Sequence, residues 1–241
     1  MEFGLWEKYY EEILEDFGFS RSGDEESARL LDEILSVEGC FTLEELRELV
    51  SFSDKFIVFG AGPSIKEHIK MLKEEYDLKD YVLLPADGAT TALIEERIIP
   101  DVIATDLDGN LDDIFLANLR GANVVIHAHA DNIDKIASLT PFFDNILGTT
   151  QSQPIGNLYN FGGFTDGDRA VYLAVALGAS EITLAGMDFG NIVTQYSRPN
   201  LTTKTAEADD FKKKKLRYAE MLIDWIKENE PVEIINLINN K

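Results

Sequence analysis

The stretch Leu84–Gly109, LPADGATTALIEERIIPDVIATDLDG, alternates between apolar and polar segments in a way that indicates the fold class. An apolar strand-like run ends at Asp87, an apolar helix-like segment follows, and a second strand-like run ends at Asp106 and Asp108. Strand, helix and strand in succession are typical of an α/β domain. The stretch also places three carboxylates where strands stop and turns begin.

The same alternation continues on both sides of this stretch, from residue 55 onward. The strand candidates are KFIVFG, YVLLPA, DVIATDL, ANVVIHA, DNILGTT and EITLAGMD; the helix candidates between them are SIKEHIKMLKEEYD, TTALIEER, LDDIFLANLR, ADNIDKIASL and DGDRAVYLAVALG. Strands that are apolar throughout require a sheet covered on both faces. We therefore predict an α/β fold with a mostly parallel sheet and helices on both faces. After Asp188 we expect a loop of about 17 residues, a helix from Ala206 to about Asn229, and a last strand in VEIINLI.

The first 52 residues are predicted to form a separate helical region, before an α/β catalytic domain at 53–241. Apolar residues recur at helical spacing in two stripes, within residues 5–17 and 30–35. Two segments match the capping-box spacing that marks helix starts: Ser22 to Glu25, and Thr42 to Glu45. We expect the stripes to pack on the following domain or on a partner subunit, so a homo-oligomer is one expectation.

The charge and composition limit the partners. The chain has 241 residues, 45% of them hydrophobic, and a formal net charge of −22. Such an acidic protein repels nucleic acid and anionic membranes, so an anionic substrate requires a local basic patch or a metal ion. The single cysteine, Cys40, excludes an intramolecular disulfide. No apolar run reaches the roughly 18 residues of a membrane span and the N-terminus does not resemble a signal peptide, so we expect a cytoplasmic protein.

The three carboxylates of the opening stretch predict a metal site. Asp87 follows one strand and Asp106 and Asp108 follow another, and the carboxyl ends of parallel strands carry the ligand sites of such sheets. An extended Asp-x-Asp pair directs both side chains to one side. Oxygen ligands without His or Cys favour Mg²⁺. The alternative is that each aspartate only stabilises an Asp-Gly type of turn.

The glycine-rich segment FGAGPS lies between a strand and a helix. Gly60, Gly62, Pro63 and Ser64 could bring backbone N–H groups close to a phosphate at the helix N-terminus. A tight turn that needs glycine for its backbone angles is the alternative.

Downstream, the segment NFGGFTDGDRA combines acidic residues with one cation. Thr165 or Asp166 can cap the helix that follows, and Asp166 or Asp168 could add a carboxylate to the metal site. Arg169 could contact a phosphate or form a salt bridge. On the later helix, Lys215 falls on the apolar stripe and needs an anionic partner, either a phosphate or a carboxylate.

The segment IHAHADN gathers two of the three histidines at a strand end. We expect His127 and His129, with Asp131 and Asn132 after them, to bind substrate or transfer a proton; a polar strand end capped by Asp131 is the alternative. The segments GTTQS, which contains Gln151, and GMDFG end two further strands and could line the same cleft.

These segments resemble two related families. Ala-Asp-Gly, a helix, Pro-Asp, a strand, Asp-x-Asp and a distant Thr-Asp resemble the catalytic domain of thiamin pyrophosphokinase, in which the corresponding acidic residues bind Mg²⁺ and ATP; by motif they are Asp87, Asp106, Asp108 and Asp166. From about Phe56 to Ile235 the chain resembles archaeal 6-hydroxymethyl-7,8-dihydropterin diphosphokinases of the MptE-like type, through GAGPS, ADGAT, PD with TDLDG, HAHADN, GTTQ, FGGFTDGDRA and GMDFG. DGATT and DLDG depart from the thiamin pattern and agree with the pterin one.

The resemblance implies transfer of a diphosphate from ATP to the hydroxymethyl group of a dihydropterin. It implies Mg²⁺ bound by the four aspartates, phosphates bound by Gly60, Gly62, Pro63, Ser64, Arg169 and Lys215, and the pterin bound by His127, His129, Asp131, Asn132 and Gln151. Thiamin pyrophosphokinase is one alternative. A nucleotide-sugar-dependent glycosyltransferase is another, because flagellar glycosylation proteins share the Gly-x-Gly-Pro-Ser loop.

Overall fold

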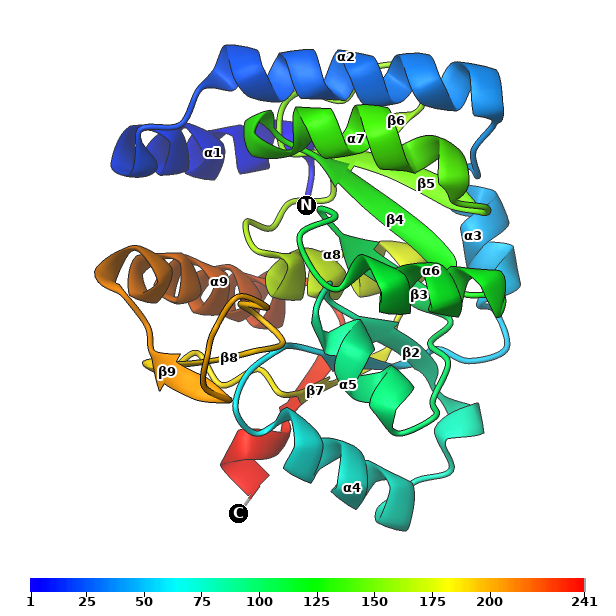
Figure 1. The fold of residues 1–241 in the computed structure, drawn as a ribbon, viewed down its shortest axis with the longest axis vertical. Helices are drawn as coiled ribbons and strands as arrows, with labels where there is room; N and C mark the ends of the chain where they lie inside the picture. The colour runs from blue at the N-terminus through cyan, green and yellow to red at the C-terminus, as the bar shows by residue number, and fades with distance from the viewer. Residues whose placement is uncertain (241) are drawn as a thin grey trace.

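A computed structural model of the chain describes residues 1–240 and shows an α/β fold with helices on both faces of a parallel sheet (Figure 1). Its strands run in the spatial order β10-β7-β1-β2 and β3-β4-β5-β6, and every neighbouring pair within these two groups is parallel. A parallel bridge between Ala86 and Ala104 joins β2 to β3. The predicted fold class is therefore confirmed. The strand bounds are β1 (Lys55–Phe59), β2 (Val82–Pro85), β3 (Val102–Thr105), β4 (Asn123–Ala128), β5 (Ile146–Thr150), β6 (Leu158–Tyr159), β7 (Glu181–Ala185) and β10 (Glu233–Asn236).

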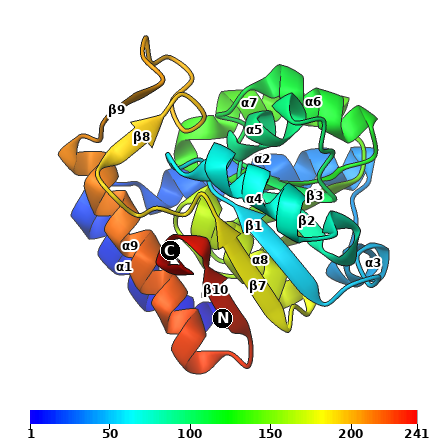
Figure 2. The same cartoon turned by 90° about the horizontal axis from the view of Figure 1, so that it is seen from below.

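Strand β1 lies between β7 and β2 (Figure 2). Its alternate residues face the two helical layers, as the pleat of a strand requires. Ile57 and Phe59 share a buried cluster with residues of α4 (Ile65–Glu75) and α5 (Ala89–Glu95). Phe56 and Val58 share another with residues of α8 (Asp166–Leu177) and α9 (Asp210–Asn229). The remaining helices of the α/β part are α6 (Leu111–Leu119) and α7 (Ile133–Leu139), with short 3₁₀ turns η1 (Leu78–Asp80), η2 (Ala130–Asn132), η3 (Thr140–Phe142) and η4 (Leu237–Asn240).

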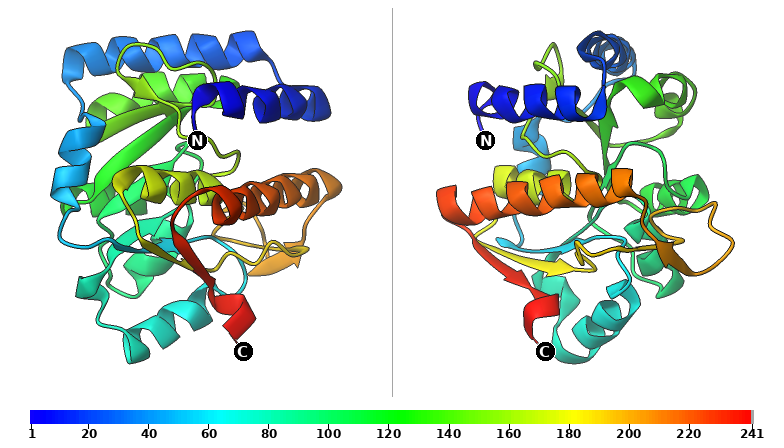
Figure 3. Two further views of the ribbon diagram at one scale, coloured as in Figure 1. Left: turned by 180° about the vertical axis from the view of Figure 1, so that it is seen from behind. Right: turned by 90° about the vertical axis from the view of Figure 1, so that its left-hand side faces the viewer.

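The N-terminal residues form three helices that pack on the α/β part of the same chain. They are α1 (Phe3–Phe17), α2 (Arg21–Glu38) and α3 (Leu43–Leu49). Trp6 and Tyr10 of α1 belong to the buried cluster of α8 and α9, and Figure 3 shows α1 on the same side as these two helices. Leu31 of α2 packs in the cluster that contains strand β4. The boundary at residue 52 stays a prediction.

One of the two predicted helix starts is confirmed and the other is wrong. Thr42 and Glu45 form the expected capping box of α3. In α2, however, the hydroxyl of Ser20 accepts the Gly23 N–H, so the helix begins at Arg21, before the predicted cap at Ser22.

The segment expected to be an unbroken loop after Asp188 contains a small antiparallel pair, β8 (Ile192–Thr194) with β9 (Thr205–Glu207). Ala206 pairs with Val193 in this ribbon and cannot begin the helix there. Instead, the Asp209 side chain accepts the Lys212 N–H and caps α9, which begins at Asp210. Within residues 1–240, none of the helices combines the length and the apolar character that a membrane crossing demands.

Candidate active site

The polar segments predicted from the sequence gather at the carboxyl edge of the sheet, where the chain changes direction across it. From β1 the chain adds β2 to one side, and it later returns through α8 to add β7 to the other. Parallel sheets bind ligands at such switch points. A pocket opens here, lined among others by Gly60–Gly62 after β1, Asp87 after β2, Thr165–Gly167 at the start of α8, and Gly186–Gly190 after β7.

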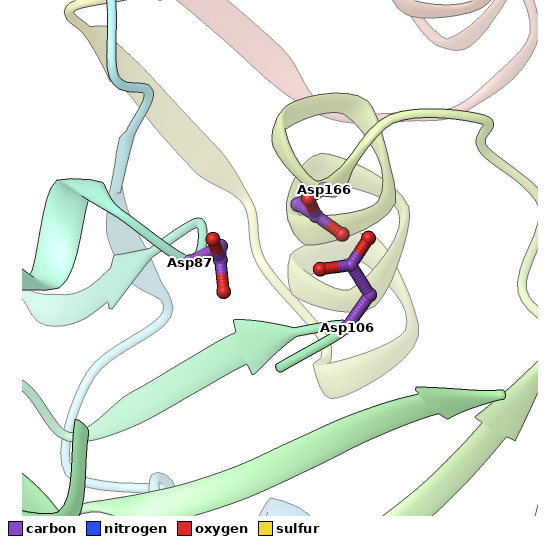
Figure 4. A group of neighbouring side chains, drawn as sticks. All are labelled: Asp87, Asp106 and Asp166. Carbon is purple, nitrogen blue, oxygen red and sulfur yellow. The ribbon is translucent and has the colours of Figure 1, made fainter. Parts of the chain in front are cut away.

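Three carboxylates meet beside this pocket: Asp87 after β2, Asp106 after β3, and Asp166 as the first residue of α8 (Figure 4). One oxygen of each lies within 4.8 Å of the others. We call this group the aspartate triad. Thr105 fixes part of its geometry, because its hydroxyl donates to Asp87 Oδ1 at 2.5 Å.

Asp108 lies outside the triad, contrary to the expectation from the Asp-x-Asp spacing. The expectation required an extended backbone, but Leu107 between the two aspartates is buried and has φ 67°. This left-handed residue turns the chain, so the Asp108 side chain is 70% exposed and pairs with Lys135. Asp168 is also outside, because it accepts the N–H groups of Phe164 and Thr165 and caps α8 with Thr165.

The triad carries unequal pKa values. Burial, followed by the charges of Asp106 and Asp166, raises the pKa of Asp87 well above its ordinary value. Burial and then Asp106 raise the pKa of Asp166 to about 6. Burial alone would also raise the pKa of Asp106, but the His129 hydrogen bond and charge, with Arg169 and Lys215, lower it to about 2. Crowded carboxylates of this kind favour either a proton or a bound cation.

Arg169 of α8, Lys212 and Lys215 of α9, and the imidazole of His129 after β4 lie near the triad. Arg169 Nη1 lies 3.4 Å from Asp166 Oδ1, and His129 Nε2 lies 3.3 Å from Asp106 Oδ2. Lys215 Nζ lies 5.1 Å from the ring centroid of Phe164, and Lys212 lines the pocket. Among residues 1–240, neither lysine has a carboxylate within 4.0 Å of its ammonium group. The acidic chain thus has the local basic patch that an anionic substrate requires.

Gln151 positions Arg169 through its side-chain amide. Its Oε1 accepts from Arg169 Nη2 at 2.8 Å, while its Nε2 donates to Asp24 Oδ2 at 2.8 Å. Asp24, on α2, is 1% exposed and also accepts from Tyr10 Oη at 2.6 Å. The sequence interpretation missed Asp24. Its position four residues before the buried Ala28, on the inward stripe of α2, was the available signal.

The HAHADN segment divides into residues that face the site and residues that build it. The side chain of His127 is buried. The imidazole of His129 contacts the Asp106 carboxylate through Nε2. The side-chain amide of Asn132 forms hydrogen bonds to the backbone around the site. Its Nδ2 donates to Asp106 O at 2.9 Å and to His127 O at 2.7 Å, and its Oδ1 accepts the His129 N–H. Asp131 is exposed. Asn132 thus bonds within the chain, and the expected contact of Asp131 and Asn132 with a substrate stays a prediction.

The glycine loop packs against the end of β7. The N–H groups of Gly60 and Gly62 donate to Ala185 O and Gly186 O, and Ser64 donates through both N–H and hydroxyl to Asp188 Oδ2. A Cβ at Gly62 would lie 2.1 Å from Asp188 Oδ2. These contacts account for the glycines by close backbone approach. The N–H groups expected at a phosphate are already bonded, and Pro63 has none, although Gly60 and Gly62 line the pocket.

Comparison with known proteins finds one matching family model and several similar proteins. The family model described as "6-hydroxymethylpterin diphosphokinase MptE-like" matches residues 29–194. Proteins named 6-hydroxymethyl-7,8-dihydropterin pyrophosphokinase are similar over nearly their whole length. The protein from Methanothermobacter thermautotrophicus is 52% identical, covering 97% of this chain and 99% of the relative. The proteins from Methanocaldococcus jannaschii and Pyrococcus furiosus are each 44% identical, covering 98% of this chain and 100% and 98% of the relatives.

One solved structure, a MAf glycosyltransferase from Magnetospirillum magneticum, shares the fold with a TM-score of 0.51 and 15% identity, over 84% of this chain and 39% of that one. At this identity the likeness concerns the fold alone. The family match and the full-length relatives confirm the resemblance seen in the sequence segments: the chain belongs to the MptE-like family of 6-hydroxymethylpterin diphosphokinases.

Proposed function

We propose that this protein transfers a diphosphate from ATP to the hydroxymethyl group of 6-hydroxymethyl-7,8-dihydropterin, giving AMP and the pterin diphosphate. The observation that carries the proposal is the identity of 44–52%, over 97–98% of the chain, to three proteins named for this activity. In this reaction the hydroxymethyl oxygen bonds to the β-phosphorus. The bond from that phosphorus to the oxygen bridging to the α-phosphate breaks, and AMP leaves.

Asp87, Asp106 and Asp166 are the residues that would hold Mg²⁺. The donor set fits this ion, since it consists of carboxylate oxygens within 4.8 Å of one another, whereas the nearby imidazole of His129 is engaged with Asp106. When bound, Mg²⁺ would neutralise phosphate charge and hold the transferred group in place.

The side chains around the triad then perform the positioning that diphosphate transfer needs. Lys212 lines the pocket and Arg169 and Lys215 lie close enough to affect Asp106 and Asp166, so these three side chains would supply positive charge for the phosphates, and the N-terminus of α8 directs its dipole to the same place. The pocket at residues 60–62 and 186–190 accommodates the nucleotide. Because phosphoryl groups pass through a loose transition state, positioning and charge can suffice without a strong general base.

Chromatography of the fluorescent pterin and of AMP, after mixing the protein with ATP and Mg²⁺, tests the proposal. AMP should form with 6-hydroxymethyl-7,8-dihydropterin, and not with thiamin as the acceptor. Hydrolysis of a nucleotide sugar, with no reaction of ATP, would indicate the glycosyltransferase alternative instead.

Matched variants test the metal ligands in the same assay. Asp87→Asn should abolish the reaction, because it removes a triad carboxylate, whereas Asp108→Asn should retain it, because Asp108 is exposed and lies outside the triad. Equal loss in both variants would contradict the assigned ligand set.

A further inference from the structure

A series of buried hydrogen bonds leads from the N-terminal helices to the aspartate triad. Tyr10 Oη of α1 donates to Asp24 Oδ2 at 2.6 Å, and Gln151 Nε2 donates to the same oxygen at 2.8 Å. Gln151 Oε1 accepts from Arg169 Nη2 at 2.8 Å, and Arg169 Nη1 lies 3.4 Å from Asp166 Oδ1. Tyr10, Asp24 and Gln151 are all buried, so water does not compete for their bonds. The N-terminal helices are thus connected to the site by continuous hydrogen bonding.

Asp24 also binds the turn that follows His129. Its Oδ1 accepts the Ala130 N–H at 2.9 Å. Helix α2 approaches this turn so closely that a Cβ at Gly23 would lie 2.8 Å from Ala130 Cβ. One carboxylate therefore joins α1, the turn after His129 and the Gln151 side chain, and the last two of these lead to opposite members of the triad.

The donors and acceptors in this series allow one orientation of the Gln151 amide. A guanidinium has only N–H donors, so the amide atom that faces Arg169 must be Oε1. The carboxylate oxygen of Asp24 accepts, so the amide atom that faces it must be Nε2. Burial, followed by the Asp24 hydrogen bond, raises the pKa of Tyr10, so the Tyr10 hydroxyl keeps its proton and donates to Asp24. The amide orientation therefore depends on an acceptor at position 24.

We propose that Asp24 is a positioning residue of the active site, which holds the Gln151 amide so that Oε1 faces Arg169. Arg169 is thereby fixed beside Asp166 of the triad. This role rests on the proposed function, and it makes α1 and α2 part of the active site as well as of the core. Asp24 lies outside residues 29–194, the range that matches the family model.

An exchange of carboxylate and amide between positions 24 and 151 tests this role, with kcat measured by AMP formation from ATP and the pterin. Asp24→Asn should lower kcat about tenfold, because an N–H donor replaces an acceptor and Gln151 must then turn an N–H towards Arg169. Gln151→Glu should also lower kcat about tenfold, because two buried carboxylates then face each other. The double variant should recover kcat to within about threefold of wild type, because the carboxylate at position 151 can accept from both neighbours, whereas separate losses of packing would add.

The NMR signal of Arg169 Nε–H gives a readout that does not depend on turnover. Arg169 Nε is buried, which protects its proton from exchange, and the loss of the signal in Arg169→Lys assigns it. The signal should shift in Asp24→Asn and return towards its wild-type position in the double variant. Glu26→Gln is the matched control, because it removes an exposed carboxylate from the same helix, and it should keep the wild-type kcat and signal.

Two results would overturn the positioning role and leave the proposed function standing. The first is a folded Asp24→Asn variant with wild-type kcat and an unshifted Arg169 signal. The second is a double variant with no higher kcat than Gln151→Glu, a comparison that remains decisive if Asp24→Asn alone does not fold. Wild-type protein that forms no AMP with the pterin would overturn the proposed function, and the Arg169 signal would then still decide whether Asp24 positions Arg169.

Discussion

Replacing Asp166 by asparagine should stabilise the metal-free protein while it removes activity. The Asp166 pKa is raised from 3.8 to about 6, which is a difference of roughly two pKa units. Each pKa unit is worth about 1.4 kcal/mol, so the ionised carboxylate lowers the folding stability by about 2–3 kcal/mol above pH 7. Because the folded-state pKa is the higher one, this cost shrinks as the pH falls below 6 and is largely gone near pH 4.

Thermal unfolding in EDTA at pH 8 measures the effect. For a chain of this length, Asp166→Asn should melt about 5–10 °C higher than wild type. The gain should decline towards pH 4. Added Mg²⁺ should raise the melting temperature of wild type and not of the variant. Asp108→Asn removes an exposed charge outside the triad. This variant should melt like wild type at pH 8 and should keep the rise in melting temperature with Mg²⁺. An unchanged or lower melting temperature for Asp166→Asn at pH 8 would refute the claim that repulsion and burial of the triad carboxylates destabilise the metal-free protein.

The raised pKa of Asp166 predicts that activity at limiting Mg²⁺ falls as the pH drops through about 6, because protons compete with the metal for Asp166. Steady-state pH profiles at limiting and saturating Mg²⁺ measure this effect, and the lost activity should return at saturating Mg²⁺. Gln151→Leu should lower kcat about tenfold, because Arg169 loses a charged hydrogen bond to the Gln151 side chain. An unaltered kcat in a folded variant would show that activity does not depend on Gln151 holding Arg169 in place. Gly62→Ala should destabilise the protein by about 1–3 kcal/mol in urea unfolding, because its Cβ would lie 2.6 Å from the backbone oxygen of Gly186 and 2.1 Å from Asp188 Oδ2. Gly4→Ala, with nothing within 4 Å of the added Cβ, should not.

The parts of the fold that the sequence predicts are those set by apolar periodicity. Strands such as β1 and β4 are buried on both faces, and their uninterrupted apolar runs are visible without coordinates. The ribbon of β8 and β9 was missed because it is short and partly exposed, so its pairing leaves little trace in the pattern. The two-residue strand β6 was missed for the same reason of length.

At the site, sequence spacing was reliable where the backbone was regular and misleading where it was not. Asp87, Asp106 and Asp166 lie at the ends of predicted elements, and the parallel sheet brings those ends together. Asp108 was expected beside Asp106 but lies outside the triad, because Leu107 adopts a left-handed conformation that is unusual for leucine and is not visible in composition. The bond between Asp24 and Gln151 joins residues 127 positions apart, so only the packing of α2 on the sheet reveals it.

The local charges explain how so acidic a protein can bind a nucleotide. The positive charges of Arg169 and Lys215 act on Asp106 and Asp166, and Lys212 lines the same pocket, so cationic side chains locally offset the carboxylates within a chain of net charge −22. A divalent cation at the triad would make the site positive only locally, and the surrounding acidic surface would still repel free anions. Metal and phosphates should therefore bind cooperatively, since each supplies the charge that the other requires.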